Sequence, residues 1–302
     1  NKLEAYKLSW IIMVLAFPLL GGAVYAVLST SLFSRKLKGN LRRSLALLAP
    51  LRRHRTPIHT LLAEYRKEQN SLATYVSSMA GYPLYKGGDA HYLPEGELMF
   101  THMLAEIEKA ESYVFLEFFI VSNDSLLQSL LEVLARKVKE GVEVLFLYDD
   151  MGSMFRLPNS FPELLADMGI QCRRFNHLVP VLSTQFNHRD HRKIVVIDGK
   201  VAFTGGINLA DEYINKRERF GYWKDGGVVF TGEAAWGMSL MFLELWTATG
   251  TQPLPTKDVI LHYCPDLRYL DAAEPLSDGE SVGEDFIQPY GDDPFDDVFV
   301  GH

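Results

Sequence analysis

The chain has 302 residues and a mass of 34.2 kDa, enough for one large domain or two ordinary ones with a real hydrophobic core. Hydrophobic residues make up 47% and charged residues 23%, which excludes a largely disordered chain. Two cysteines, Cys172 and Cys264, favour a reducing compartment, and no Cys/His cluster has the spacing of a zinc site. The net charge is −8, but residues 1–63 carry +9, which leaves −17 for residues 64–302.

Residues 1–34 are expected to anchor the chain in a membrane. Leu8 to Leu28 is a run of 21 residues without a charge, long enough as a helix to cross about 30 Å of hydrocarbon. Trp10 and Tyr25 lie near its two ends, where aromatic rings prefer the membrane interface. A buried core helix or a signal peptide fits this run less well, so the sequence predicts one transmembrane helix.

The segment 35–79 is basic at its start and predicts the orientation of that helix. Eight Lys or Arg follow the apolar run, and no acid occurs before Glu64, so the positive-inside rule places the body in the cytoplasm. Leu37, Leu41, Leu45 and Leu48 recur at helical spacing, which favours a helix lying on an anionic membrane surface. The alternative is a solvated linker. Because the chain begins with Asn, we expect a further segment upstream.

An α/β pattern begins near residue 80 and extends to about 255. Apolar strands are predicted at Tyr113–Val121 and Val142–Tyr148, joined by a helix that begins at Asp124 as its N-cap. Strand–helix–strand order implies parallel strands in an α/β sandwich. The pattern continues with a short helix at Pro162–Met168, a strand at Ile170–Phe175 and a helix at Ala234–Trp246.

The last segment, 256–302, differs in composition. Ten carboxylates fall between Asp271 and Asp297, no Lys or Arg follows Arg268, and Pro and Gly interrupt the segment throughout. It is predicted to be an acidic linker or the start of a further domain, without a core element.

The residues that carry chemistry are concentrated at 187–208. His191 and Lys193 share one face at the start of a strand ending at Asp198, and Gly199-Lys200 turns into a second strand, Val201–Thr204. Gly205, Gly206 and Asn208 follow, where small residues let an anion approach backbone N–H groups. An imidazole, an ammonium and an amide around one point suit a phosphodiester substrate. The competing interpretation is a surface hairpin with solvated charges.

The spacing His191-x-Lys193-x4-Asp198, followed by Gly205-Gly206-x-Asn208, resembles the HxK(x)4D signature of the phospholipase D superfamily. The stretch NHRDHRKIVVIDGKVAFTGGINLADEYIN is similar to bacterial cardiolipin synthases in particular, as are LFLYDDMGS at Leu145–Ser153 and Gly221-Tyr222-Trp223-Lys224-Asp225. Such enzymes carry a second HxK(x)4D motif, which residues 1–302 lack. The tail at Glu284–Asp297 resembles the opening of that second half, so we expect the chain to be one half of an active site.

The resemblance implies a role for each site residue. His191 would belong to a pair of histidines, one from each half, in which one attacks phosphorus and the other protonates the leaving alcohol. Lys193 would hold the phosphate with help from Asn208, and Asp198 would organise the site through hydrogen bonds. Asp225 is the candidate for orienting the His191 ring. No metal and no cofactor are implied.

Other polar residues near this cluster are given structural roles. Asp149-Asp150 is expected to form a turn, and Arg173-Arg174 a solvated strand end. For His188 and Arg189, a contact with a lipid headgroup and support of the loop are equally favoured.

Four functions compete. The first is a membrane phosphatidyltransferase that joins two phosphatidylglycerol molecules into cardiolipin and glycerol, with anionic membrane lipids as partners. The second is another phosphatidyltransferase or phosphodiesterase of the superfamily. The third is a dimeric nuclease, which the −17 charge disfavours because a nucleic acid requires a basic surface. The fourth is an inactive fragment. The second histidine would come from the other half or from a homodimer, and the chain alone is expected to have little or no activity.

Overall fold

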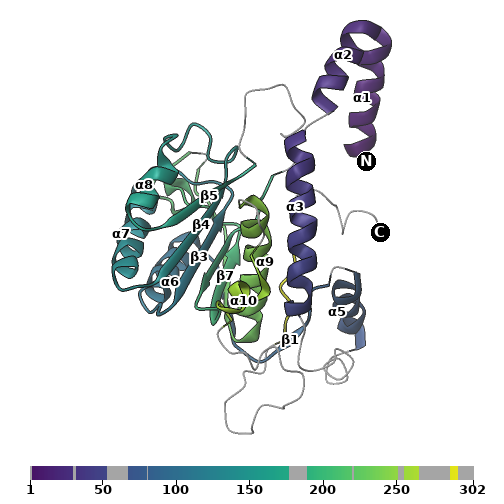
Figure 1. Ribbon diagram of the computed structural model, residues 1–302. Coiled ribbons are helices and arrows are strands. Elements are labelled where there is room, and N and C mark those ends of the chain that lie inside the picture. Colours follow the sequence, from purple (N-terminus) through teal and green to yellow (C-terminus); the bar gives the residue numbers. More distant parts are fainter. Residues whose placement is uncertain are drawn as a thin grey trace.

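The structure is a computed structural model that describes residues 2–29, 32–52, 67–79, 81–176, 189–219, 221–250, 255–264 and 286–291. Its body is a mixed sheet between two layers of helices, as Figure 1 shows. The α/β sandwich predicted from the sequence is therefore confirmed.

Seven strands form the central sheet in the order β2-β8-β7-β6-β3-β4-β5. The strands β3, β4 and β5 run parallel, as the strand–helix–strand pattern predicted, and all other neighbours are antiparallel. The bounds are β2 Ala90–Leu93, β3 Tyr113–Phe118, β4 Glu143–Asp149, β5 Gln171–Phe175, β6 Ile194–Ile197, β7 Val201–Gly205 and β8 Gly227–Thr231.

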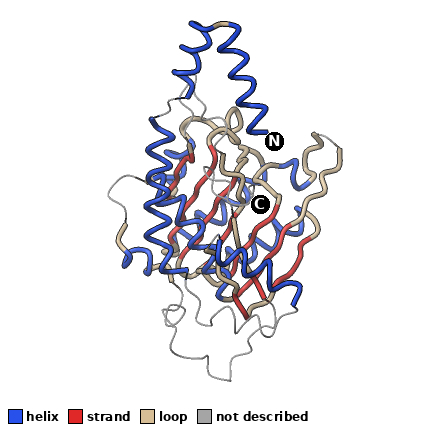
Figure 2. Tube along the Cα trace, turned by 90° about the vertical axis from the view of Figure 1, so that its right-hand side faces the viewer, coloured by secondary structure: helices blue, strands red, loops and turns tan. Residues whose placement is uncertain are grey.

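Three helices cover one face of this sheet: α6 (Gly96–Ile107), α7 (Ser125–Lys139) and α8 (Phe161–Asp167). Their apolar side chains pack on the alternate strand residues that point to this side, such as Leu116 and Phe146. Every residue of β3 is buried, because helices lie on both faces of the sheet (Figure 2). This explains why the central strands are apolar throughout instead of alternating with polar residues.

The other face is covered by α9 (Glu233–Thr249), with α10 (Lys257–Leu261) beside it. Phe242 of α9 stacks on Phe115 of β3, with ring centroids 4.6 Å apart. Residues 234–248 of α9 are all buried, since the helix lies between the sheet and a second helix, α3 (Leu32–Leu48). A helix whose residues are mostly apolar on every side requires such a position.

The basic segment therefore forms the predicted helix, but its apolar face does not lie on a membrane surface. Leu37, Leu41 and Leu48 are buried against the α9 side of the core, and Ser44 donates to the Glu244 carbonyl at 2.9 Å. A solvated linker is equally inconsistent with these contacts. After α3, the short helix η1 (Ala49–Arg52) and then α5 (Lys67–Met79) continue the chain; residues 53–66 lie outside the described part.

The apolar N-terminal run forms two helices, α1 (Lys2–Ala16) and α2 (Pro18–Ser29), in place of one continuous helix over Leu8–Leu28. The chain bends at Phe17, because Pro18 cannot continue α1 and instead takes the first position of α2. The two helices lie side by side, and Trp10 contacts Tyr25 with ring centroids 5.4 Å apart, so these rings do not mark opposite interfaces.

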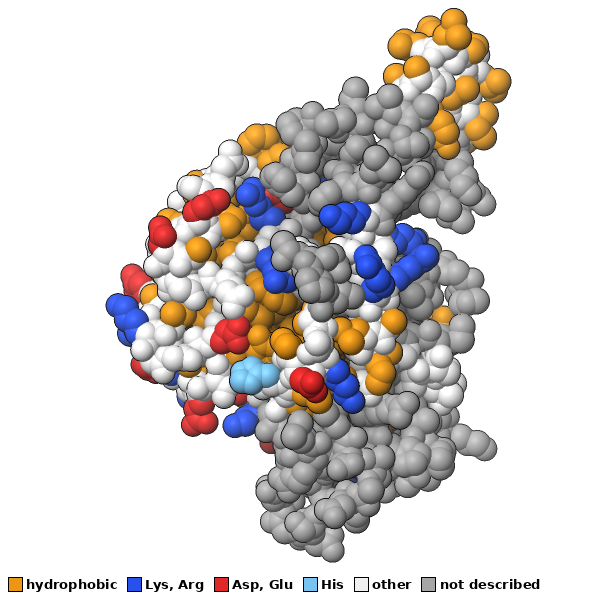
Figure 3. Space-filling view, viewed as in Figure 1, with side chains coloured by type: hydrophobic (Ala, Val, Ile, Leu, Met, Phe, Trp, Pro, Cys, Tyr) orange, Lys and Arg blue, Asp and Glu red, His pale blue; other side chains and the backbone are white. Residues whose placement is uncertain are grey.

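Gly21 makes this tight turn possible, because a Cβ there would lie 2.7 Å from the Met13 carbonyl oxygen. Figure 3 shows hydrophobic side chains over the surface of this α1–α2 hairpin and Lys and Arg side chains over α3. Among the described helices, none combines the length and apolarity needed to cross a bilayer.

The C-terminal tail contributes to the packed body, which the sequence did not predict. Its strand β9 (Phe286–Ile287) pairs antiparallel with β1 (Tyr85–Lys86). The Gln288 side chain is bonded to the Ala73 carbonyl at 3.1 Å, the Ser77 hydroxyl at 2.9 Å and the Tyr82 carbonyl at 2.9 Å. Residues 286–291 are thus a fixed element, whereas 265–285 and 292–302 lie outside the described residues.

Candidate active site

His191 and Lys193 lie together at the edge of the sheet where β6 begins and β3 ends. The Lys193 Nζ donates to the His191 carbonyl oxygen at 2.6 Å. The imidazole of His191 stacks on the Phe119 ring with centroids 3.8 Å apart, and the Lys193 ammonium lies 5.5 Å from the same ring. The two predicted residues are therefore brought together on one aromatic support, which the sequence did not identify.

The electrostatic surroundings favour a neutral imidazole beside a cation. Partial burial, followed by the charge of Lys193, lowers the pKa of His191 below its ordinary value, although Asp190 opposes this. Burial also lowers the pKa of Lys193, and the carboxylates of Asp190 and Asp225 oppose that shift. A neutral imidazole has a free lone pair at neutral pH, so His191 can act as nucleophile or base.

A buried charge cluster lies directly behind these two residues. Glu117 is fully buried on β3, and its Oε1 accepts from the Arg192 Nε at 2.7 Å. The Arg192 Nε is also 3.3 Å from the Asp190 Oδ1, so two carboxyl groups share one guanidinium. Burial raises the pKa of Glu117 well above its ordinary value; Arg192 opposes the shift and Asp190 adds to it. The loop carrying His191 is thereby fixed to β3 through the side chain next to it.

The expected turn at Asp149-Asp150 is present and is part of this support. Asp149 accepts the N–H groups of Met151 at 2.9 Å and Gly152 at 3.0 Å, and its other oxygen accepts that of Asp190 at 3.0 Å. Arg189 pairs with Asp149 at 3.4 Å, so it supports the loop. Burial raises the pKa of Asp149 to about 6. His188 lies outside the described residues.

Gly205 at the end of β7 and Gly206 directly after it make room for other groups of the protein. The N–H of Gly206 donates to the Gly226 carbonyl at 3.1 Å, so it is not directed at an anion as the sequence suggested. A Cβ on Gly206 would lie 2.1 Å from an Asp225 carboxylate oxygen, and one on Gly205 would lie 2.6 Å from the Gly227 Cα. Among the described residues no hydrogen bond joins Asp225 to His191; the Asp225 Oδ1 instead accepts the Gly226 N–H at 2.9 Å.

Asn208 is buried, and its Oδ1 accepts the N–H of Ile120 at 2.9 Å. It thereby holds the loop that carries Phe119, while its predicted contact with a phosphate stays a prediction. Asp198 lies just beyond the far end of β6, five residues after Lys193. A strand rises about 3.3 Å per residue, so the two residues are about 16 Å apart. Its carboxylate accepts the N–H groups of Glu111, Ser112 and Tyr113, each at 2.8 Å, so it fixes the start of β3 and does not reach the site.

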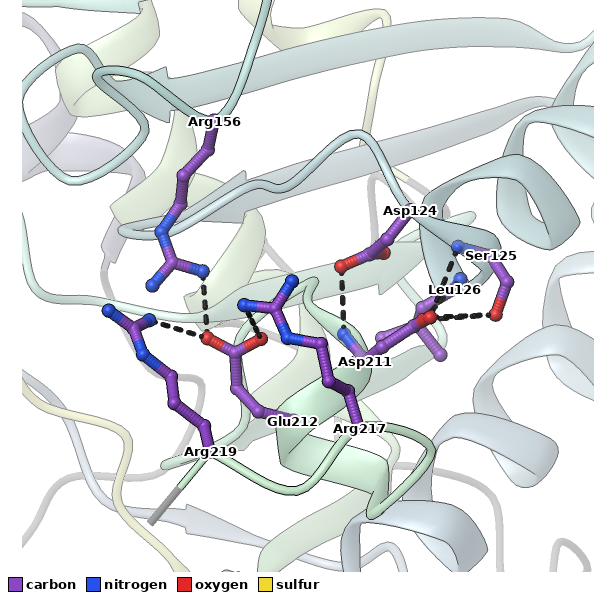
Figure 4. A network of polar contacts seen from close by, with 8 residues as sticks. All are labelled: Asp124, Ser125, Leu126, Arg156, Asp211, Glu212, Arg217 and Arg219. Carbon is purple, nitrogen blue, oxygen red and sulfur yellow. Dashed lines mark hydrogen bonds and ion pairs between the residues drawn. The ribbon is translucent and has the colours of Figure 1, made fainter.

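A second polar network follows Asn208 in the short helix η3 (Asp211–Ile214), shown in Figure 4. The Asp211 carboxylate accepts the Leu126 N–H at 2.8 Å, so its side chain caps α7 in place of the predicted Asp124. The Asp124 carboxylate instead accepts the Asp211 N–H at 2.9 Å. Glu212 binds Arg156 at 2.7 Å and Arg219 at 3.0 Å, with Arg217 at 3.8 Å. The contacts of Asp211 and those of Glu212 thus fix the segment that follows Asn208.

Two residues depart from the sequence-based expectations in an instructive way. Arg173 is not a solvated strand end, because its guanidinium lies 4.0 Å from the Trp246 ring centroid and bonds the Trp246 carbonyl oxygen. Glu117 was missed, although a single Glu within the apolar run Tyr113–Val121 is a signal for a buried charge that needs a partner.

The chain resembles known proteins both in sequence and in structure. The family model described as "Cardiolipin synthase, PLD-like domain" matches residues 103–219. An uncharacterized protein of Streptococcus mutans is 37% identical over 294 residues, covering 97% of this chain and 60% of that protein. A cardiolipin synthase of Geobacillus kaustophilus is 34% identical over 262 residues, covering 86% of this chain and 52% of that enzyme.

The phosphatidylserine synthase structure from Haemophilus influenzae matches with a TM-score of 0.46 at 16% identity, over 63% of this chain and 46% of that one. The chain spans about half the length of the curated relatives it matches. Residues 103–219 therefore form a domain that matches the phospholipase D-like domain of cardiolipin synthases.

Proposed function

We propose that this chain is one catalytic half of a phosphatidyltransferase that forms cardiolipin and glycerol from two phosphatidylglycerol molecules. The observation that carries the proposal is the pair His191–Lys193, held on Phe119 with an imidazole whose pKa is lowered. The match of residues 103–219 to the phospholipase D-like domain of cardiolipin synthases supports the same chemistry. The cell membrane is the proposed location, because the substrates are lipids.

The proposed reaction has two balanced steps. In the first, a histidine nitrogen forms a bond to phosphorus, the bond from phosphorus to the glycerol oxygen breaks, and a second histidine protonates that oxygen. In the second, a hydroxyl of another phosphatidylglycerol gives its proton to the second histidine and displaces the first from phosphorus. Lys193 stabilises the charge on the non-bridging oxygens in both steps. His191 is one member of this histidine pair, and the other comes from a second phospholipase D-like half.

Product analysis tests this proposal. The chain, assembled with its second half, is incubated with phosphatidylglycerol that is labelled in its headgroup glycerol. The lipids and the released glycerol are then quantified. The proposal predicts one cardiolipin for each labelled glycerol released. Phosphatidic acid with glycerol but no cardiolipin would instead identify a phosphodiesterase.

A further inference from the structure

A cavity of about 340 Å³ opens beside His191 and Lys193, and its lining changes character from one end to the other. Its described walls come from β6 to β8, from α9 and from residues 287–291. The lining includes three basic residues in a row, His191, Arg192 and Lys193, of which the arginine and the lysine are cations, and contains no carboxylate. A cationic opening without a carboxylate favours an anionic ligand.

The register of the sheet gives the direction of this cavity. Ile194, Thr204 and Val228 lie opposite one another on β6, β7 and β8, at the edge that carries the site. Phe230 lies two residues further along β8, about 7 Å away from this edge. Met238 and Met241 of α9 line the same cavity, and both are almost fully buried. The polar groups are therefore near the site, and the apolar ones extend from it into the body.

We propose that this cavity holds the glycerol backbone and the first acyl methylenes of the phospholipid whose phosphate lies at His191 and Lys193. The inference deepens the proposed function and rests on it. A phospholipid has the same order of groups as the cavity, with an anionic phosphate next to apolar chains. Methionine side chains adapt to ligands of variable shape, which suits mixed acyl chains.

The outer wall of the cavity is the tail segment 287–291, and its position is fixed. The pairing of β9 with β1 and the hydrogen bonds of Gln288 hold it against the body. Gly291 faces the interior, because a Cβ there would lie 2.7 Å from the terminal methyl of Met241 and 3.6 Å from the Arg192 Cδ. A side chain at residue 291 would therefore occupy the cavity, and only the flexible end of Met241 would need to move.

Photolabelling tests the inference without relying on turnover. The full chain is purified in a sterol-based detergent without a linear alkyl chain and illuminated with phosphatidylglycerol that carries a diazirine near the carbonyl end of one acyl chain. We expect labelled peptides from α9 around Met238–Met241 and from residues 286–291. Unlabelled dioctanoylphosphatidylglycerol should compete, and glycerophosphoglycerol, which has the same headgroup without acyl chains, should not.

The variant Gly291→Leu should reduce this labelling by at least about tenfold, because its side chain would exclude acyl methylenes from the cavity. Loss of one methylene contact in an apolar pocket already lowers affinity by about tenfold. Gly39→Leu is the matched control, because a Cβ at Gly39 on α3 meets nothing within 4 Å. Met241→Phe fills the same space from α9 if Gly291→Leu does not fold.

Labelling confined to other segments, or equal labelling of Gly291→Leu and the wild type, would overturn the inference. Labelling of the cavity in an enzyme that forms no cardiolipin would uphold the inference and refute the proposed function. Cardiolipin formation that is equally fast in Gly291→Leu would refute the inference alone.

Discussion

Replacing Glu117 tests how the loop that carries His191 is held. Its Oε1 accepts from Arg192 Nε at 2.7 Å, and the Glu117 and Asp190 carboxyls are close enough to hydrogen-bond once one of them is protonated. Within the described residues, the Glu117 Oε2 and the Asp190 Oδ2 have no other hydrogen-bond partner. Because burial raises the pKa of Glu117, its carboxyl takes up a proton more readily than an ordinary one, and in the protonated form it would donate to Asp190 and accept from Arg192.

Two substitutions separate this arrangement from an ordinary ion pair. Glu117→Gln keeps an acceptor for Arg192 and supplies an N–H for Asp190, so it should cost no more than about 1 kcal/mol of unfolding free energy. Glu117→Ala removes both contacts and leaves a buried guanidinium with one partner, which should cost about 3–5 kcal/mol. Guanidinium chloride unfolding of the full chain in detergent, followed by tryptophan fluorescence, measures both values at neutral pH.

The pH dependence gives an independent check. The pKa of Glu117 is higher in the folded chain than its ordinary value of 4.5, so the folded state binds more protons above that pH. The wild type should therefore lose stability relative to Glu117→Gln as the pH rises from about 4.5 through the folded pKa, by up to about 1.4 kcal/mol per pH unit. If Glu117→Gln cost as much as Glu117→Ala at every pH, the carboxyl would be ionised and this reasoning would be refuted.

Three further predictions concern other parts of the chain. Asp198→Ala leaves three backbone N–H groups at the start of β3 without an acceptor and should lower the unfolding free energy by about 2–4 kcal/mol; a loss below 0.5 kcal/mol in guanidinium chloride unfolding would contradict this. Gly206→Ala should displace Asp225 and reduce the rate of cardiolipin formation at least about tenfold, with Gly39→Ala as the unaffected control; equal rates would show that the displaced carboxylate has no role in the site. Cysteines that replace Trp10 and Tyr25, in a chain without its native cysteines, should be cross-linked by a short bis-maleimide. Cross-linking is detected by gel mobility after the chain has been cleaved by a protease between the two positions. Absence of a cross-link would contradict the hairpin, because a continuous helix would separate these positions by about 22 Å.

The local pattern of the sequence was sufficient for the central sheet. The apolar runs at Tyr113–Val121 and Val142–Tyr148 predicted β3 and β4 to within three residues, because strands buried on both faces leave a continuous apolar signal. The antiparallel pair around Gly199-Lys200 was predicted from its turn residues and is confirmed. Helix α9 was predicted at Ala234–Trp246 and extends one residue earlier and three residues later.

What could not be predicted depends on contacts between segments far apart in the chain. The leucine spacing of α3 indicates an apolar face, but spacing cannot show whether lipid or α9 covers it. Proline is tolerated in membrane helices, so Pro18 within the apolar run does not by itself exclude one continuous helix, yet the chain reverses there.

The candidate site shows the same division. The spacing of His191 and Lys193 placed both at the start of β6, and the structure confirms that placement. Phe119 could not be found from the sequence, because it reaches His191 only through the pairing of β3 with β6. Asp198 is part of the same sequence motif, yet the length of β6 separates it from the site.

The role of His191 is the central claim, and cardiolipin formation from phosphatidylglycerol by the assembled enzyme tests it most directly. The initial rate is measured for the wild type, for His191→Ala and for His102→Ala, which removes an exposed histidine of α6. Because the His191 side chain is only partly buried, its truncation should leave the unfolding transition nearly unchanged. The account predicts that His191→Ala loses at least about 10²-fold in rate while His102→Ala stays near the wild type. A folded His191→Ala enzyme whose rate is within about tenfold of the wild type would contradict it.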